Sequence, residues 1–157
     1  MKFALRDVKT IQHAVKVDSP SIGTVRRTYG DEETSDYLKL WILDLCQSVN
    51  LKRPLTETQI DEISLLIITE FNNITLADAY LVFKNAKMGK YGSFYESLDC
   101  PKVLTWFSDY MDERMSVHMN RSQTEHNQHK SESRRVDAPG EFMNKLEVEN
   151  ILKNKKK

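Results

Sequence analysis

Apolar residues recur in several segments between residues 19 and 118 at the three- and four-residue spacing of an α-helix. Proline near the start and glycine at the end predict a short helix over 20–29, and three carboxylates at 31–33 predict the start of a longer helix that runs to about Val49. This longer helix carries two apolar stripes, which is typical of a helix at the centre of a bundle. The first stripe comprises Leu38, Trp41, Ile42, Leu45 and Val49, and the second comprises Leu40, Leu43 and Cys46.

A third helix is predicted over 57–71 by its start signal. Thr56 and Gln59 have the spacing of a capping box, in which each side chain satisfies a backbone N–H that the first turn leaves unpaired. Four consecutive apolar residues at 65–68 are also compatible with a strand, because periodicity does not separate the two in so short a run. The length of the segment and its cap favour the helix.

Two more helices complete the predicted domain. Thr75 caps a helix that Gly89 ends, and Asp99 caps a strongly amphipathic helix from about Cys100 to Val117. The fold class predicted is therefore all-α, a compact bundle of about four to five helices.

The polar pattern of the chain changes after His118. Residues 119–140 hold so few apolar side chains that burial cannot offset the entropy of ordering them, so a disordered polar linker is predicted. Residues 141–157 regain helical spacing and end in a basic tail, which predicts a short terminal amphipathic helix. Its candidate partner contacts are Phe142, Leu146 and Ile151. The predicted organisation is an N-terminal extension over 1–18, a helical domain over 19–118, the linker and the terminal helix.

Charge is unevenly distributed although the chain is neutral as a whole. Residues 1–18, 19–118 and 119–157 carry formal charges of +2, −5 and +3, so basic ends flank an acidic body. This balance does not fit a general nucleic-acid or membrane binder. With no run of eighteen apolar residues and no secretory signal pattern, we expect a cytoplasmic protein, and we expect Cys46 and Cys100 to be free thiols.

The run Lys87-Met-Gly-Lys-Tyr-Gly-Ser-Phe-Tyr95 is the best candidate for a special surface. Its glycines lack the spacing of a phosphate-binding loop. Lysines interleaved with aromatic side chains are instead typical of single-stranded nucleic-acid platforms. The alternative is that the aromatics pack between two helices as core while the lysines face solvent. The candidate contacts for nucleic acid or a partner are Lys84, Lys87, Lys90, Tyr91, Phe94 and Tyr95.

No group of residues in the sequence indicates an enzymatic reaction. Asp109 with Asp112 or Glu113 falls on the polar face of a helix with no nucleophile or histidine to organise around. His126 and His129 lack the cysteine or carboxylate that would complete a metal site. We therefore expect no catalytic, cofactor or metal site, and no enzyme.

Two motifs resemble those of a family of small proteins encoded by phages and mobile elements of Bacteroidetes, including crAss-like phages. They are Lys-x-Gly-x-Tyr-Gly-x-x-Tyr at 87–95 and Trp-Phe-x-x-Tyr-x-x-Glu-Arg at 106–114, within a resemblance that covers about residues 10–117. The resemblance implies a helical domain and a phage or mobile-element context, with the host cytoplasm as the site of action. It assigns no functional residue.

Three functions remain open at this point. A protein-binding adaptor, for example in DNA replication or host takeover, fits a small acidic body with a tethered amphipathic segment. A nucleic-acid-binding protein would use Lys84, Lys87 and Lys90, against the repulsion of the acidic body. A minor virion component shares the composition of the adaptor. We expect a protein partner and no membrane.

Overall fold

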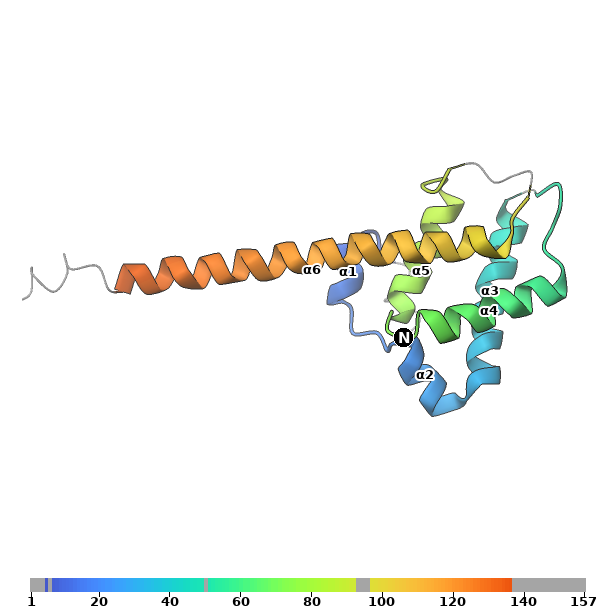
Figure 1. Cartoon of the computed structure of the whole chain (residues 1–157), viewed down its shortest axis with the longest axis horizontal. Helices are drawn as coiled ribbons and strands as arrows, with labels where there is room; N and C mark the ends of the chain where they lie inside the picture. Colours follow the sequence, from blue (N-terminus) through green and yellow to red (C-terminus); the bar gives the residue numbers. More distant parts are fainter. Residues whose placement is uncertain (1–4, 6, 50, 93–96, 137–157) are drawn as a thin grey trace, which may run out of the picture. The chain divides into compact units, whose positions relative to one another are not determined.

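The computed structural model describes residues 5, 7–49, 51–92 and 97–136, with the backbone alone for residues 125, 128, 129 and 131–136 (Figure 1). These residues contain six helices and no strand, which confirms the all-α prediction. The helices are α1 (Ile11–Lys16), α2 (Ile22–Tyr29), α3 (Asp31–Ser48), α4 (Glu57–Glu70), α5 (Leu76–Lys87) and α6 (Cys100–Val136). The chain divides into two units, Met1–Val117 and His118–Lys157.

Side-chain caps set the starts of the helices much as the sequence predicts. Thr56 and Gln59 form the expected capping box of α4, and Thr75 with Asp78 forms a second one at α5. Ser21 caps α2, which begins at Ile22 and not at Pro20. Pro20 precedes this cap, and its carbonyl oxygen accepts a hydrogen bond of 3.0 Å from the Leu76 N–H.

Only one of the two apolar stripes predicted on α3 is buried. Leu38, Ile42 and Leu45 have no exposed surface, whereas Leu40 is 62% exposed and Leu43 is 42% exposed. Helices α2, α4 and α5 pack on α3. The prediction that α3 is buried on both sides is therefore wrong. Leu40 and Leu43 of the second stripe face solvent, while Cys46 is partly buried against the core.

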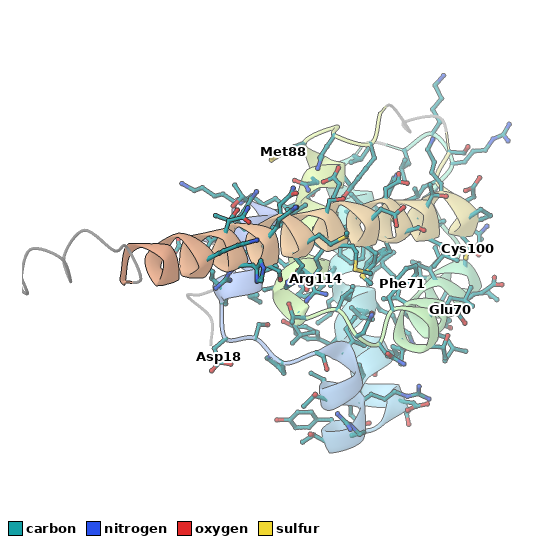
Figure 2. The ribbon with its side chains drawn as sticks, turned by 60° about the vertical axis from the view of Figure 1, so that its left-hand side comes forward. Asp18, Glu70, Phe71, Met88, Cys100 and Arg114 are labelled. Carbon is teal, nitrogen blue, oxygen red and sulfur yellow. The ribbon has the colours of Figure 1, made fainter. Side chains whose placement is uncertain are left out.

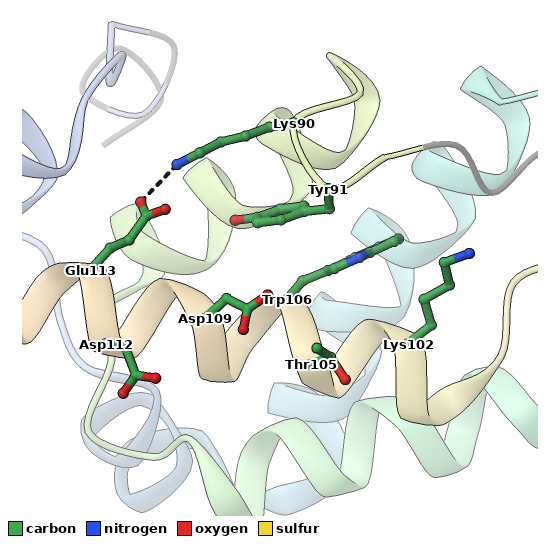
Figure 3. Close-up of a pocket in the computed structure, with 8 residues that line it drawn as sticks. All are labelled: Lys90, Tyr91, Lys102, Thr105, Trp106, Asp109, Asp112 and Glu113. Carbon is green, nitrogen blue, oxygen red and sulfur yellow. Dashed lines mark hydrogen bonds and ion pairs between the residues drawn. The ribbon is translucent and has the colours of Figure 1, made fainter.

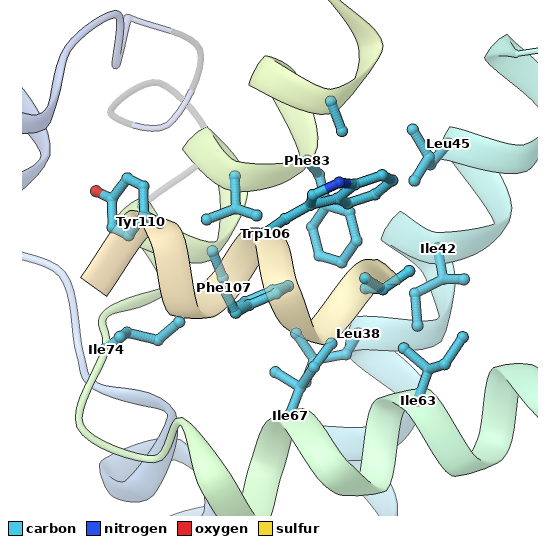
Figure 4. Close-up of a cluster of buried hydrophobic side chains, with 14 of the residues drawn as sticks. Leu38, Ile42, Leu45, Ile63, Ile67, Ile74, Phe83, Trp106, Phe107 and Tyr110 are labelled. Atoms are coloured by element: carbon cyan, nitrogen blue, oxygen red, sulfur yellow. The ribbon is translucent and has the colours of Figure 1, made fainter. Parts of the chain in front are cut away.

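The core of the first unit is built around Phe107 of α6 (Figure 4). Its ring centroid lies 5.3 Å from that of Phe71 and 5.6 Å from that of Phe83. Figure 2 shows Phe71 at the end of α4, beside the first half of α6. Fully burying one large apolar side chain stabilises a fold by roughly 1.5–3 kcal/mol, so this aromatic cluster holds α4, α5 and α6 together.

The N-terminal segment contains a helix that the sequence analysis did not predict. Thr10 caps α1 by accepting from the His13 N–H at 3.2 Å, and α1 packs against α5. Val8 and Ala14 are buried in the core. Residues 8–17 thus belong to the helical body and are not a simple extension. A six-residue helix offers too few turns for its periodicity to be recognised.

Helix α6 ends at Val136 and not near Val117, so residues 119–136, for which the sequence predicts a disordered linker, are helical in the structure. Polarity argues against burial, but it does not argue against extending a helix that is already nucleated. The stretch contains no glycine or proline, and it includes arginine, glutamine and glutamate, which favour helix. Residues 137–157, with Phe142, Leu146 and Ile151, lie outside the described residues. None of the described helices is long and apolar enough to cross a membrane.

Candidate functional site

Lys84 is bound to the N-terminal segment. Its Nζ donates a hydrogen bond of 2.8 Å to the Val8 carbonyl oxygen, and it lies 5.8 Å from the centroid of the Tyr80 ring. A charged donor on a carbonyl oxygen and a nearby aromatic face both stabilise an ammonium group. This lysine therefore links α5 to the segment before α1, and its charge is directed into the body.

Lys87 and Lys90 are each paired with a carboxylate from another helix. Lys87 forms an ion pair with Asp44 of α3, and Lys90 Nζ lies 2.7 Å from Glu113 Oε2 of α6 (Figure 3). Paired carboxylates offset the positive charge that a phosphate backbone would need. The structure brings the three predicted lysines to one end of α5, but each makes a bond within the body.

Tyr91 packs against the body, as expected if the aromatic side chains of residues 87–95 lie between two helices. Its ring stacks on that of Trp106, with centroids 5.5 Å apart and planes 14° apart. Its hydroxyl is buried and has no hydrogen-bond partner among the described residues. Burial raises the pKa of Tyr91 to about 12, helped by the carboxylates of Glu113 and Asp109 and opposed by the side chain of Asn85. Phe94 and Tyr95, the other predicted contacts, lie outside the described residues.

An open depression of about 550 Å³ adjoins this stacked pair (Figure 3). Thr105 is the only hydroxyl besides Tyr91 among its lining side chains, and it donates to the Pro101 carbonyl oxygen at 2.8 Å, so no base activates it. Three carboxylates and two ammonium groups make the wall net negative. The lining residues are Lys90, Tyr91, Lys102, Thr105, Trp106, Asp109, Asp112 and Glu113.

A second hollow lies between α2, α3 and the start of α5, and the sequence analysis missed it. Its volume is about 510 Å³ and most of its exposed lining is apolar. Tyr29 is 66% exposed and Tyr37 is 37% exposed. We call this hollow the α2–α3 groove. It is lined by Pro20, Thr24, Val25, Thr28, Tyr29, Glu33, Tyr37 and Leu76.

The walls of the α2–α3 groove are held by the corner between the two helices. Gly30 has a φ of 99°, a value that favours glycine, and it reverses the chain between α2 and α3. Arg26 then binds Asp31 with two hydrogen bonds of 2.6 Å across the corner. These bonds favour the charged carboxylate and lower the pKa of Asp31.

Backbone hydrogen bonds fix the other end of the groove. The Ile22 N–H donates to the Ile74 carbonyl oxygen at 2.8 Å, and the Leu76 N–H donates to Pro20. The start of α2 is thus tied to the start of α5. The signal in the sequence was a pair of tyrosines on successive helices, Tyr29 before the glycine corner and Tyr37 two turns beyond it, but periodicity alone did not show which side they face.

Residues 52–157 match the model of DUF6633, a family of unknown function. The chain belongs to this family. The DUF6633 region contains α4, α5 and α6, and with them the three lysines and Tyr91, whereas α2 and α3 precede it. No curated protein and no solved structure matches the chain.

Proposed function

We propose that this DUF6633 protein is a non-enzymatic adaptor that binds another protein, as an accessory factor of a phage or mobile element. The binding role rests on one observation, the α2–α3 groove with its solvent-exposed Tyr29 and Tyr37. The proposed context rests on the motifs at 87–95 and 106–114, and it makes factors of DNA replication or host takeover the first partners to test.

Tyrosines at the edge of an apolar groove suit a protein interface. A tyrosine supplies a large contact area, loses little conformational entropy when it is fixed, and keeps a hydroxyl for a polar contact. Leu40 and Leu43 extend the exposed apolar surface along α3. Apolar side chains that remain exposed together, beside a hollow of this size, are typical of a docking surface.

Nucleic acid is less well supported as the ligand. Each lysine of the predicted patch already has a partner within the body. Asp109, Asp112 and Glu113 line the depression beside Tyr91, and carboxylates there would repel phosphates.

Capture of partners from cells that express the tagged protein tests the proposal. We expect proteins that remain bound after nuclease treatment and are lost with the double variant Tyr29→Ala and Tyr37→Ala. The matched control is Leu65→Ala, which removes a 51% exposed leucine from α4 and should retain the same proteins.

Two results would contradict the adaptor. Partners released by nuclease would indicate nucleic acid, and anisotropy with single-stranded oligonucleotides would then show binding that Lys87→Glu with Lys90→Glu weakens. Partners retained by the double groove variant would show that the groove is not the binding surface. Circular dichroism of each variant establishes that it is folded.

A further inference from the structure

The α2–α3 groove contains one formal charge, the carboxylate of Glu33. Among the described residues Glu33 forms no ion pair, whereas its neighbour Asp31 is held by Arg26. The nearest basic side chain along α2, Arg27, is turned back onto the Gly23 carbonyl oxygen at 3.2 Å. The groove is therefore apolar with an uncompensated negative charge at one wall.

The face of α3 that carries Glu33 continues into the exposed apolar surface of this helix. Glu33, Tyr37 and Leu40 are spaced by four and three residues, so they lie along one face of the helix. Leu43 lies one further turn along, and this set of four residues is the α3 outer stripe. From Glu33 to Leu40 the stripe runs about 10 Å, close to two helical turns.

We propose that the groove and the α3 outer stripe bind an amphipathic helix of another protein, with lysine or arginine placed beside its apolar residues. The inference rests on the proposed function and adds the chemistry of the partner. A straight stripe bordering a groove suits a helix that inserts apolar side chains at helical spacing. A basic side chain on that helix would neutralise Glu33, and the excess negative charge of residues 19–118 would favour its approach.

A second copy of the chain fits this surface less well. In a twofold dimer the stripe would meet itself, and every contact would occur twice. The stripe carries Glu33 and no lysine or arginine of its own to pair with it. Such a dimer would bury an unpaired carboxylate from each copy, which is unfavourable.

Two fluorescent model helices of about 18 residues, five turns long, test the inference. One consists of leucine and lysine and the other of leucine and glutamate in the same pattern. We expect the lysine peptide to bind the full-length protein at least about tenfold more tightly by anisotropy. Tyr37→Ala should weaken that binding about tenfold, and Glu33→Gln should reduce the preference between the peptides several-fold.

Leu65→Ala on α4 is the control and should bind as the wild type does. Tyr37 also contacts Trp41, with ring centroids 4.9 Å apart, so Tyr29→Ala provides a second variant if Tyr37→Ala does not fold. Tyr29 is mostly exposed and its removal leaves the core intact.

The outcomes separate this inference from the proposed function. Equal binding of both peptides, or no change with Glu33→Gln, overturns the basic partner and leaves the groove as a docking surface. If neither peptide binds while cellular partners are still lost with the double groove variant, the helix chemistry is wrong and the adaptor stands. A dimer in sedimentation that Tyr37→Ala dissociates would make a second copy the occupant and overturn the inference.

Discussion

The Tyr110 hydroxyl donates a hydrogen bond of 2.6 Å to Asp78 Oδ1, and both residues are buried. The other carboxylate oxygen accepts from the N–H and the hydroxyl of Thr75, each at 2.9 Å, and lies 3.2 Å from Arg114 Nε. Arg114 lies on α6 in Figure 2, and its Nε is not aligned for a hydrogen bond. One carboxylate therefore caps α5 and joins it to α6. Burial, followed by the bond to Asp78, raises the pKa of Tyr110.

Replacing Asp78 should be among the most destabilising single changes in the body. Asp78→Ala removes the cap and leaves the Tyr110 hydroxyl and the Arg114 guanidinium without their buried partner. We expect the free energy of unfolding to fall by about 3–5 kcal/mol in urea titrations. Tyr110→Phe removes one charged hydrogen bond and should cost about 1.5–3 kcal/mol.

Asp112→Ala is the control for this network, since it removes an exposed carboxylate from the same helix. It should change the free energy of unfolding by less than about 0.5 kcal/mol. Equal effects of Asp78→Ala and Asp112→Ala would show that the buried network contributes nothing specific.

Local signals in the sequence predicted the helices α2 to α6, because caps and spacing act over three or four residues. The contact between Asp78 and Tyr110 joins positions 32 residues apart, and no local pattern specifies such a pair. The same limit applies to the lysines. Lys87 and Lys90 find their carboxylates 43 and 23 residues away, so a row that looks free along the sequence is paired in the fold.

Substitution of two leucines on α3, two residues apart, should change the free energy of unfolding by very different amounts. Leu38 is fully buried and Leu40 is 62% exposed. Leu38→Ala should lower the free energy of unfolding by about 2–5 kcal/mol, because it removes buried methyl groups and leaves a cavity. Leu40→Gln should change it by less than about 0.5 kcal/mol, because its side chain has little buried surface to lose.

Chemical denaturation of both variants beside the wild type measures this difference. A large loss with Leu40→Gln would mean that the second apolar stripe is buried after all, and it would remove the α3 outer stripe as a binding surface. The comparison also shows where periodicity stops being informative. Two stripes of similar composition look alike in sequence, and only the placement of α2, α4 and α5 decides which one is covered.

The raised pKa of Tyr91 predicts a loss of stability at high pH. An ordinary tyrosine titrates near 10, whereas the pKa of Tyr91 is raised to about 12 in the fold. The unfolded chain therefore loses this proton first as the pH rises. The contribution of Tyr91 is fully present below about pH 10 and is lost between pH 10 and 12.

Urea unfolding at a series of pH values checks this expectation. The free energy of unfolding should fall less steeply above pH 10 in Tyr91→Phe than in the wild type. A near-ultraviolet absorbance titration should also lose its component near pH 12 in that variant. An unchanged titration would show that the Tyr91 hydroxyl is not held neutral by the fold. Tyr37→Phe provides a comparison from a different site. Burial raises the pKa of Tyr37 too, and Tyr37 lies in the α2–α3 groove.

A chain cut after His118 should fold by itself. Every buried apolar residue among those described lies between Val8 and Tyr110, and the ion pair between Arg114 and Asp78 is also retained. We expect residues 1–118 to unfold cooperatively, with a midpoint close to that of the full chain in thermal and urea denaturation. A matched chain cut after Asp109 loses Tyr110 and Arg114 and should unfold without a cooperative transition. Loss of cooperativity in the longer fragment would place the domain boundary beyond residue 118, because the residues that remain would then be insufficient to hold α5 and α6 together.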